Sequence, residues 1–337
     1  MSVRHRARRG ALAAVALLVV LALLHGAAWL WATERLRSGY EAWAASLRAQ
    51  GWTVRSGPPV LAGWPLTAEL AVPSPALAGG GDLVPGGVAW SSEGVRLRLS
   101  PLAPGTLEIV AEGAQRVRLA TLPEAVVTAG LLAVEAPLAG DGTAELRGRA
   151  VQVAVAGERV EIAMLRAVPI PGGVRAEAQA IALPQGYAWA LGASVEAASA
   201  DVVVTGSPAP ALPGATAAQQ AARWRDAGGR VDVPQFALRW GPLDAGGSGS
   251  GTLDARLQPR AEASVQLRGW PAALDQLTRG GAILPGAALA ARAALGLFAR
   301  ASGGSAQGAA VVPLAVANGV LTAGGIPLLR LPEVAWP

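Results

Sequence analysis

The sequence predicts a mainly β fold of the β-rich α+β class, with an N-terminal transmembrane helix followed by a large curved antiparallel sheet and a few short helices. Residues 11–31 form an almost uncharged apolar run. From Trp52 onward, short segments that alternate apolar and polar residues are separated by glycine and proline. A period of two residues is typical of half-buried strands, and glycine and proline mark the turns between them.

The apolar run is long enough to cross a membrane as a helix. About 20 residues, each rising about 1.5 Å, span the roughly 30 Å hydrocarbon core of a bilayer. We therefore expect a transmembrane anchor over residues 11–33, with two indole rings at the outer interface, where such rings are favoured. The residues that carry this prediction are Leu17, Leu18, Leu21, Leu24, Trp29 and Trp31.

Four arginines precede the run and indicate its orientation. Arginine and lysine are enriched on the cytoplasmic side of membrane helices. We expect residues 1–10 to be a cytoplasmic tail and everything after the anchor to lie across the membrane. The orienting residues are Arg4, Arg6, Arg8 and Arg9.

A cleaved signal peptide is the alternative for the same stretch. Residues 11–24 would then be its apolar region, with a small-residue cleavage site near residues 25–28. We favour the uncleaved anchor because residues 28–31 continue the apolar run beyond that site.

The net charge of +5 does not indicate a nucleic-acid partner. Residues 1–37 contain six arginines and one glutamate, and the remaining 300 residues contain 22 cations and 22 acids. The basic charge is therefore an orientation signal rather than a phosphate-binding surface. The chain has no cysteine and no lysine, which excludes disulfides, thiolate metal sites, Schiff-base lysines and P-loop lysines.

Residues 34–50 are predicted to form an amphipathic stalk helix that continues the anchor. Leu36, Tyr40, Trp43 and Leu47 recur at steps of four, three and four, which places them on one helix face. Gly51 is placed to end this helix. We expect the stripe to pack on the β-rich domain that follows, over residues 51–337.

Alternating apolar residues predict that this domain is a train of antiparallel strands. The strands expected first cover residues 66–72, 95–99, 106–110, 117–120, 126–134, 144–155, 159–164, 174–183 and 202–204. The clearest strands come later, at residues 236–240, 253–257 and 263–267. The glycine-rich segment 246–251 is expected to be a flexible hairpin connection, since it matches neither a calcium loop nor a P-loop.

Short helices are predicted where alanine-rich segments follow a proline or precede glycines. They cover residues 215–227, 272–278 and 286–301. The pair Asn318-Gly319 predicts a tight hairpin near the end of the chain. A candidate subdivision of the domain falls near residues 206–230.

Several short motifs resemble the domain-of-unknown-function family numbered 2125. They include Tyr40-Glu41-Ala42-Trp43, Gly63-Trp64-Pro65-Leu66 and Leu238-Arg239-Trp240-Gly241-Pro242-Leu243, with Trp64 where the family usually has phenylalanine. Members are membrane-anchored envelope proteins of Gram-negative bacteria, so the resemblance implies the inner membrane, with the bulk of the chain in the periplasm. It brings no catalytic residue. A fainter likeness to AsmA-like envelope proteins, whose long curved sheets are associated with lipid traffic, is an analogy.

The outer domain offers little equipment for catalysis. The two histidines, His5 and His25, fall in the tail and the anchor, so no imidazole is available there for a triad or a metal site. We expect His25 to be a tolerated polar residue that reaches the interface, and we predict no catalytic residue, metal site or cofactor. Carboxylates that are close in sequence are expected on solvated faces, namely Asp141 with Glu145 and Glu158 with Glu161.

Five tryptophans of this domain fall at predicted strand ends or turns, in a chain with only two Phe and two Tyr. They are candidates either for ordinary packing or for the lining of an apolar groove. These residues are Trp64, Trp90, Trp189, Trp240 and Trp270.

Three functions are compatible with these observations. The leading hypothesis is a non-catalytic binding module for lipid or another apolar ligand, because an Ala-, Val- and Leu-rich sheet tethered to a membrane can present a continuous apolar face. The alternative is an envelope scaffold or protein-interaction subunit that uses a sheet edge or the stalk stripe. A carboxylate-based hydrolase is third. The ligand, protein partners and oligomeric state stay open.

Overall fold

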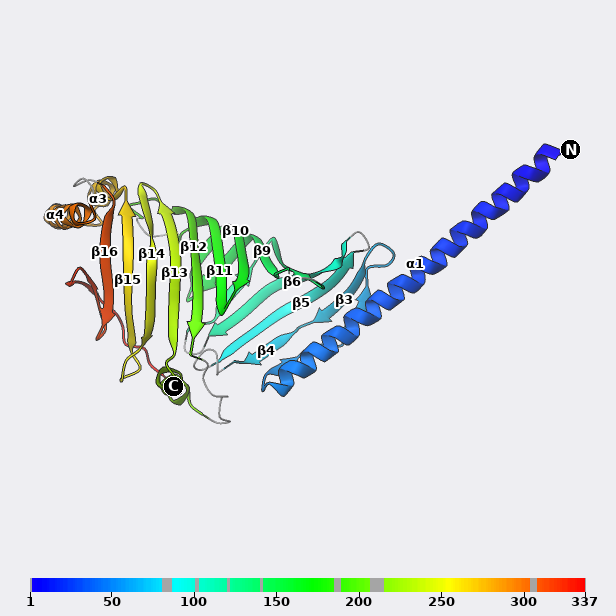
Figure 1. The fold of residues 1–337 in the computed structure, drawn as a ribbon, viewed down its shortest axis with the longest axis horizontal. Helices are drawn as coiled ribbons and strands as arrows, with labels where there is room; N and C mark the ends of the chain where they lie inside the picture. The colour runs from blue at the N-terminus through cyan, green and yellow to red at the C-terminus, as the bar shows by residue number, and fades with distance from the viewer. Residues whose placement is uncertain are drawn as a thin grey trace.

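A computed structural model describes residues 2–80, 87–100, 103–119, 122–139, 142–184, 189–206, 215–303 and 308–336, with the backbone alone for residues 2–14, 103 and 104. Within these residues, 18 strands form one sheet, and a long helix projects from one end of it (Figure 1). Two shorter helices pack at the opposite end. The fold is mainly β with a large antiparallel sheet, which confirms the predicted class.

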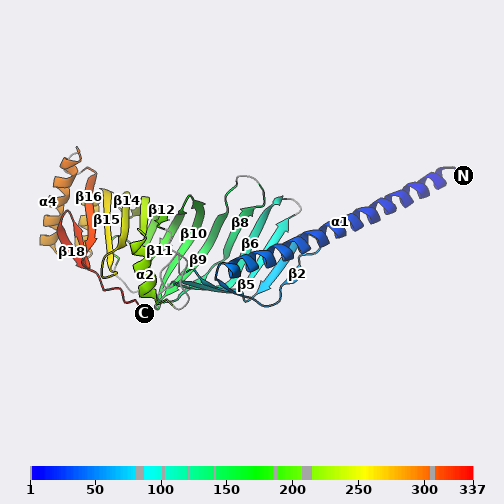
Figure 2. The same cartoon turned by 60° about the horizontal axis from the view of Figure 1, so that its bottom comes forward.

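Helix α1 (Ser2–Ala49) runs without a break through the ranges predicted as tail, anchor and stalk. Among the described residues, it is the one helix long and apolar enough to be a candidate membrane span. Its first part extends away from the sheet (Figures 1 and 2), and its last part lies along β3 (Ala68–Pro73). Gly51, with φ of 86°, follows the helix at the turn into the first strand.

The first half of the sheet contains both short strands and very long ones. Its strands are β1 (Thr53–Arg55), β2 (Val60–Ala62), β3 (Ala68–Pro73), β4 (Ala76–Gly79), β5 (Val88–Ser100), β6 (Ala103–Leu119), β7 (Ala125–Thr128), β8 (Leu131–Pro137) and β9 (Glu145–Val155). The pairing order is β2–β3–β5–β6–β8–β9, while β4 pairs with β1 and β5, and β7 pairs with β6 and β9.

The second half is a regular meander in which each strand pairs with the next along the chain. Its strands are β10 (Glu158–Ile170), β11 (Gly173–Ala182), β12 (Ser194–Thr205), β13 (Arg230–Trp240), β14 (Leu243–Leu253), β15 (Pro259–Arg268), β16 (Ala310–Ala317), β17 (Val320–Ala323) and β18 (Ile326–Arg330). β9 pairs with β10, so one sheet continues through both halves. The hairpin predicted at Asn318-Gly319 joins β16 to β17.

One face of the sheet is apolar over most of its width. Residues paired directly across neighbouring strands point to the same face. A chain of such pairs crosses twelve strands and contains only apolar residues and glycine: Leu70, Leu97, Ile109, Val134, Leu146, Ala167, Ala176, Ala200, Phe236, Gly247, Val265 and Val312. We call this face the groove face.

Helices cover the groove face at its two ends. At one end, Leu36 of α1 packs on Ala68, Leu70 and Val72 of β3, which confirms that the stalk docks on the domain. At the other end, α3 (Trp270–Arg279) and α4 (Pro285–Ala301) close a second core. That core is built from Trp270, Leu274, Ala299, Ala310 and Val312.

The remaining helix, α2 (Ala217–Asp226), begins with a complete capping box. Thr216 accepts a hydrogen bond from the backbone N–H of Gln219, and the side chain of Gln219 accepts one from the backbone N–H of Thr216. This exchange satisfies donors that a helix N-terminus otherwise leaves free. All three short helices lie where the sequence predicts them.

Glycine in long strands accounts for two wrong strand boundaries. Residues 106–110 and 117–120 were expected to be separate strands, but β6 continues through Gly113, where its register with β5 shifts between Ser92 and Gly94. The expected strand 126–134 is instead split into β7 and β8 at Gly130. A bulge or a break changes the pattern of apolar residues too little to be predicted from the neighbouring sequence.

The prediction for the glycine-rich segment was wrong. Residues 246–251 form the middle of β14, and residues 254–258, expected in part as a strand, make the turn that follows. A Cβ on Gly247 would lie 2.0 Å from the carbonyl oxygen of Ser264 on β15. Glycine is therefore required here because the two strands approach each other closely.

Candidate functional site: an apolar groove between the stalk and the sheet

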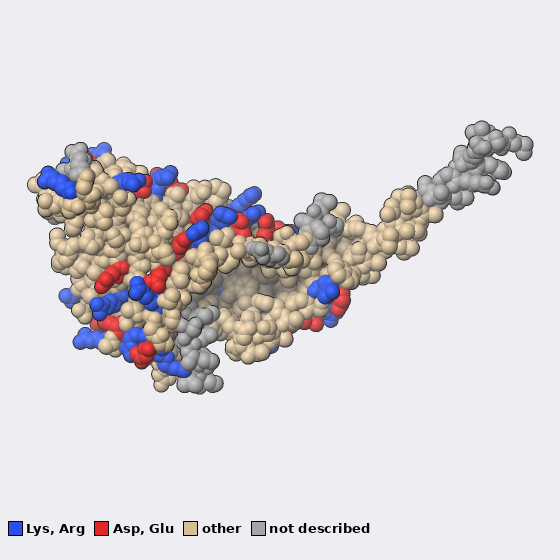
Figure 3. All heavy atoms as spheres, viewed as in Figure 1, with Lys and Arg blue, Asp and Glu red and all other residues tan. Residues whose placement is uncertain are grey.

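A cavity of about 670 Å³ lies between the last turns of α1 and the groove face. Figure 3 shows the surface hollowed between the sheet and the lower part of α1. The helix contributes one wall, over residues 35–43, and strands β5, β6, β8 and β9 contribute the floor. We call this cavity the stalk groove.

The floor of the stalk groove is formed by strands in which apolar and charged residues alternate. Val95, Leu97 and Leu99 of β5 point into the stalk groove, while Arg96 and Arg98 between them point to the opposite face. Leu107 and Ile109 of β6 pair with Leu99 and Leu97, and they extend the apolar surface. The predicted strand 95–99 therefore has the predicted alternation, and its apolar side faces a cavity.

A β-bulge adds an aromatic ring to the lining. Trp90 and Val95 are five residues apart on β5, so in a regular strand they would face opposite sides. The register shifts between Ser92 and Gly94, and both side chains consequently line the stalk groove. The hydroxyl of Ser92 holds the bulge by donating to the carbonyl oxygen of Gly94 at 2.7 Å.

Two aromatic rings of α1 form the facing wall. Tyr40 and Trp43 are three residues apart, so they lie on one side of the helix with ring centroids 6.0 Å apart. The Tyr40 hydroxyl donates to Oγ of Ser56 at 2.9 Å, which fixes the ring beside β1. Trp43, predicted as part of a docking stripe, lines the stalk groove instead of being buried in the helix–sheet contact.

The charged residues that line the stalk groove are all positive. Arg35 of α1 and Arg55 of β1 are the charged residues that line the stalk groove, and the lining contains no Asp, Glu or His. Among the described residues, no carboxylate forms an ion pair with either guanidinium. The Arg35 guanidinium instead lies 5.4 Å from the ring centroid of Trp31, a cation–π contact.

One buried polar atom of the lining lacks a partner within the described part of the chain. Gln115 is only 3 % exposed, and its side-chain N–H groups donate to the carbonyl oxygens of Glu112 and Gly113. Its Oε1 accepts no hydrogen bond from the described residues. An unpaired buried acceptor is costly, so this oxygen provides a place for a donor from a bound molecule or water.

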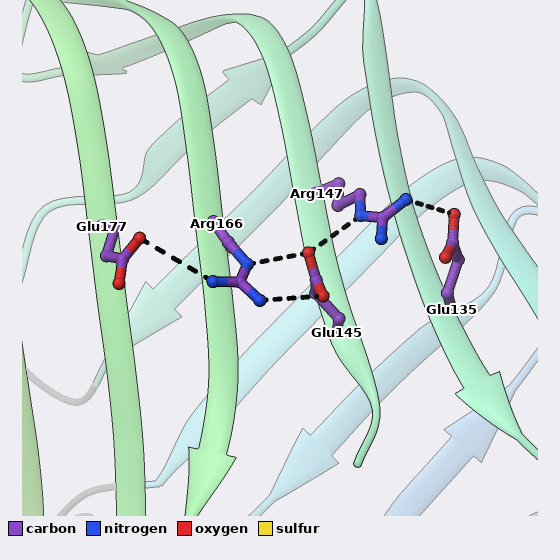
Figure 4. A network of polar contacts seen from close by, with 5 residues as sticks. All are labelled: Glu135, Glu145, Arg147, Arg166 and Glu177. Atoms are coloured by element: carbon purple, nitrogen blue, oxygen red, sulfur yellow. Dashed lines mark hydrogen bonds and ion pairs between the residues drawn. The ribbon is translucent and has the colours of Figure 1, made fainter. Parts of the chain in front are cut away.

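The opposite face carries a ladder of ion pairs (Figure 4). Glu145 of β9 accepts hydrogen bonds from Arg166 at 2.9 Å and Arg147 at 2.8 Å, and Arg147 also pairs with Glu135 at 2.8 Å. The hydrogen bond from Arg166, followed by that from Arg147, lowers the pKa of Glu145 to about 2. The Glu145 side chain is 20 % exposed, so it lies on this polar face but is not fully solvated as expected.

Of the carboxylates predicted on solvated faces, Glu158 and Glu161 are exposed on β10, as expected. Asp141 falls outside the described residues, so its relation to Glu145 is not described. Arg175 forms a bidentate pair with Asp201, which lowers the pKa of that carboxyl through hydrogen bonding. Within the described residues, no group of three or more potential ligands is placed to hold a metal ion.

Of the five candidate tryptophans, the structure brings Trp90 into the stalk groove. Trp189 and Trp240 pack on each other with centroids 6.0 Å apart, and Trp270, the first residue of α3, is buried in the second core. Trp64 contacts α1 near His25, outside the groove. The orienting arginines have no described side chains, whereas Leu17, Leu18, Leu21 and Leu24 are exposed along α1.

Sequence reasoning missed several groove residues. Arg35, Arg55 and Gln115 were not candidates, because a single polar residue carries no periodic signal. Trp43 and Leu97 could be placed on the correct helix or strand face, but their shared cavity depends on how α1 crosses β5.

Fold and site together define a class: a β-sheet protein with one candidate membrane-spanning helix and an apolar groove where that helix meets the sheet. The profile of a bacterial family described as an uncharacterized protein conserved in bacteria (DUF2125) matches residues 29–332. The chain therefore belongs to this family, as the motif resemblance indicates. Comparison with curated proteins and with solved structures gave no match. The likeness to AsmA-like proteins stays a prediction.

Proposed function

We propose that α1 anchors this protein in the inner membrane and that the stalk groove binds the apolar chain of a lipid without catalysing a reaction. The observation that carries this proposal is the apolar cavity of about 670 Å³, one wall of which is formed by α1. Ligand pockets of about 300–1,000 Å³ are typical for small molecules.

The position of the groove supports a ligand drawn from the membrane. The first groove residue on α1 is Arg35, two positions beyond the predicted end of the anchor at Thr33. An acyl chain leaving the bilayer at this level reaches apolar surface after a short path. Arg35 and Arg55, which form no ion pair with a described carboxylate, suit an anionic headgroup, because a guanidinium pairs with phosphate or carboxylate oxygens.

The orientation follows the positive charge of residues 1–37. With the arginine-rich tail in the cytoplasm, the sheet and its groove lie in the periplasm. The uncleaved form is supported by contacts within the alternative cleavage site, since His25 hydrogen-bonds the backbone of the β2–β3 hairpin.

Filling the groove tests the proposal. We expect the full-length protein, extracted from membranes in mild detergent, to release phospholipid in native mass spectrometry. Ala111→Trp places an indole in the groove floor and should reduce the bound lipid by an order of magnitude. Ala237→Trp is the matched control, because Ala237 is exposed on the opposite face of β13. Ligand-free wild-type protein, or equal lipid in Ala111→Trp, contradicts lipid binding in this groove.

A protein-interaction role is the second candidate, and the last strand favours it. β18 forms an edge of the sheet, and Ile326, Leu328 and Leu329 are exposed there. Exposed apolar edge strands are sites for added strands from partners. Leu328→Lys should abolish such binding in pull-downs from solubilised membranes and leave lipid binding unchanged.

A further inference from the structure

The hairpin between β2 and β3 folds back onto the membrane-proximal part of α1. Its tip consists of residues 63–67, which include no charged side chain. Nε2 of His25 donates to the carbonyl oxygen of Pro65 at 2.7 Å, and Nε1 of Trp29 donates to that of Thr67 at 2.7 Å. The Trp64 ring lies 5.3 Å from that of His25 and 5.5 Å from that of Trp29.

The length of the span decides how deep this contact lies. Arg9 is the last charged residue before the apolar run, and Glu34 is the first after it. If hydrocarbon begins directly after Arg9, about 20 residues bring its far boundary to Trp29. His25, four residues earlier, then lies about 6 Å inside that boundary, at about 1.5 Å per residue.

Other placements of the helix do not lift the tip out of the bilayer. If the hydrocarbon region extends to Thr33, His25 lies about 12 Å inside the boundary and Trp29 about 6 Å inside. Moving the helix the other way would draw arginines into hydrocarbon, which is costly. A tip bonded to both His25 and Trp29 therefore reaches the bilayer interface or passes just beneath it.

The exposed side chains of the tip suit that environment. Leu66 is 78 % exposed and Trp64 is 55 % exposed, and neither contributes to the sheet's core. Several backbone groups of the tip are paired: the carbonyls of Pro65 and Thr67 accept from α1, and that of Gly63 accepts from the N–H of Thr67 at 2.9 Å. Each such pairing lowers the cost of moving a loop out of water.

We propose that the tip is a second membrane contact, with Trp64 and Leu66 inserted into the periplasmic leaflet beside α1. The surface that it fits is the lipid interface, where an indole and an aliphatic side chain next to a polar boundary are favoured. Two contact points restrict rotation of the whole protein about the axis of α1 and hold the mouth of the stalk groove at a constant height above the bilayer. The proposal rests on the membrane anchoring proposed above and is independent of lipid binding in the groove.

The absence of native cysteine makes a depth measurement direct. Leu66→Cys, Val20→Cys and Leu289→Cys each replace an exposed residue, at the tip, within the span and on α4 at the far end of the sheet. Each full-length variant carries an environment-sensitive fluorophore in nanodiscs of phosphatidylcholine and phosphatidylglycerol. Doxyl quenchers are placed on lipid chains near the headgroup or near the chain end.

We expect the label at Leu66 to be quenched most strongly by the quencher near the headgroup, and the label at Leu289 to be unaffected. The label at Val20 should be quenched by the deeper probe. If Leu66 is no more quenched than Leu289 while Val20 is quenched, the tip contact is wrong and anchoring stands; a protein partner would then cover the tip. If Val20 is also unquenched, anchoring itself fails. Unchanged melting temperatures confirm that the variants fold.

Discussion

At the scale of single residues, the two faces of β9 carry different kinds of side chain, apolar on one face and charged on the other. Leu146 lines the stalk groove, whereas Glu145 and Arg147 on either side of it belong to the ion-pair ladder. Glu145 lies directly opposite Glu135, and Arg147 lies directly opposite Arg166. Like charges opposite each other are unfavourable, and the long arginine side chains relieve this by reaching diagonal carboxylates.

The low pKa of Glu145 predicts a pH dependence of stability. Its folded value of about 2 is below the ordinary value of 4.5, so the ion pairs add stability above the ordinary pKa. This contribution is lost as the pH falls through that window towards 2. In the upper part of that window, from about pH 5 to about pH 3, we expect the urea midpoint of Glu145→Gln to fall less steeply than that of the wild type.

A neighbouring carboxylate provides the control for this titration. Glu161 on β10 makes no ion pair within the described residues. Glu161→Gln should therefore retain the wild-type pH profile of the urea midpoint. A Glu145→Gln profile identical to wild type would show that the ladder does not depress the pKa of this carboxyl.

At the scale of elements, the start of α3 depends on one glycine. Gly269 has φ of 67°, and a Cβ there would lie 1.8 Å from the carbonyl oxygen of Pro242. The tight approach lets Trp270, directly after it, enter the core between α3, α4 and β16. The sequence predicts a helix over residues 272–278, after Pro271, but it does not indicate that glycine is required before the helix.

Substitution of Gly269 should therefore weaken the second core. We expect Gly269→Ala to lower the free energy of unfolding by about 3 kcal/mol or more, since left-handed strain alone costs about 1–3 kcal/mol and the carbonyl contact adds to it. Gly286→Ala at the start of α4 is the matched control, because among the described residues no atom outside its own helix backbone and its chain neighbours lies within 4 Å of its added Cβ. Chemical denaturation measures both, and a loss in Gly269→Ala no greater than in the control contradicts this account.

At the scale of the whole molecule, the groove face is closed at its ends by α1 and by α3 with α4. Between them, residues such as Ala167, Ala176 and Ala200 are only half-buried. The stalk thus has two roles, because it buries the end of the sheet and walls the cavity. Removing it would expose Leu70 and Val72, which are almost completely buried.

Two truncated variants distinguish the contribution of the stalk from that of the membrane span. A variant lacking residues 1–50 should aggregate or bind the dye ANS strongly, because it exposes the apolar surface of β3. A variant lacking only residues 1–24 retains Leu36 and Tyr40 and should bind much less ANS. Size-exclusion chromatography and ANS fluorescence compare the two. A monomeric variant without residues 1–50 and with low ANS signal would show that the stalk does not complete the core.

Local patterns were sufficient for the candidate span, the stalk, the short helices and most strands, because apolar periodicity and turn residues act over a few positions. Distant pairing decided the rest. The register shift that turns Trp90 into the groove arises from the pairing of β5 with β6. The glycines of β14 are explained by the close approach of β15. The sequence by itself determined a β-rich protein with an apolar N-terminal helix. Only the tertiary structure brought Arg35, Gln115 and Leu97 to one cavity, because no pattern within one strand or helix encodes which element crosses it.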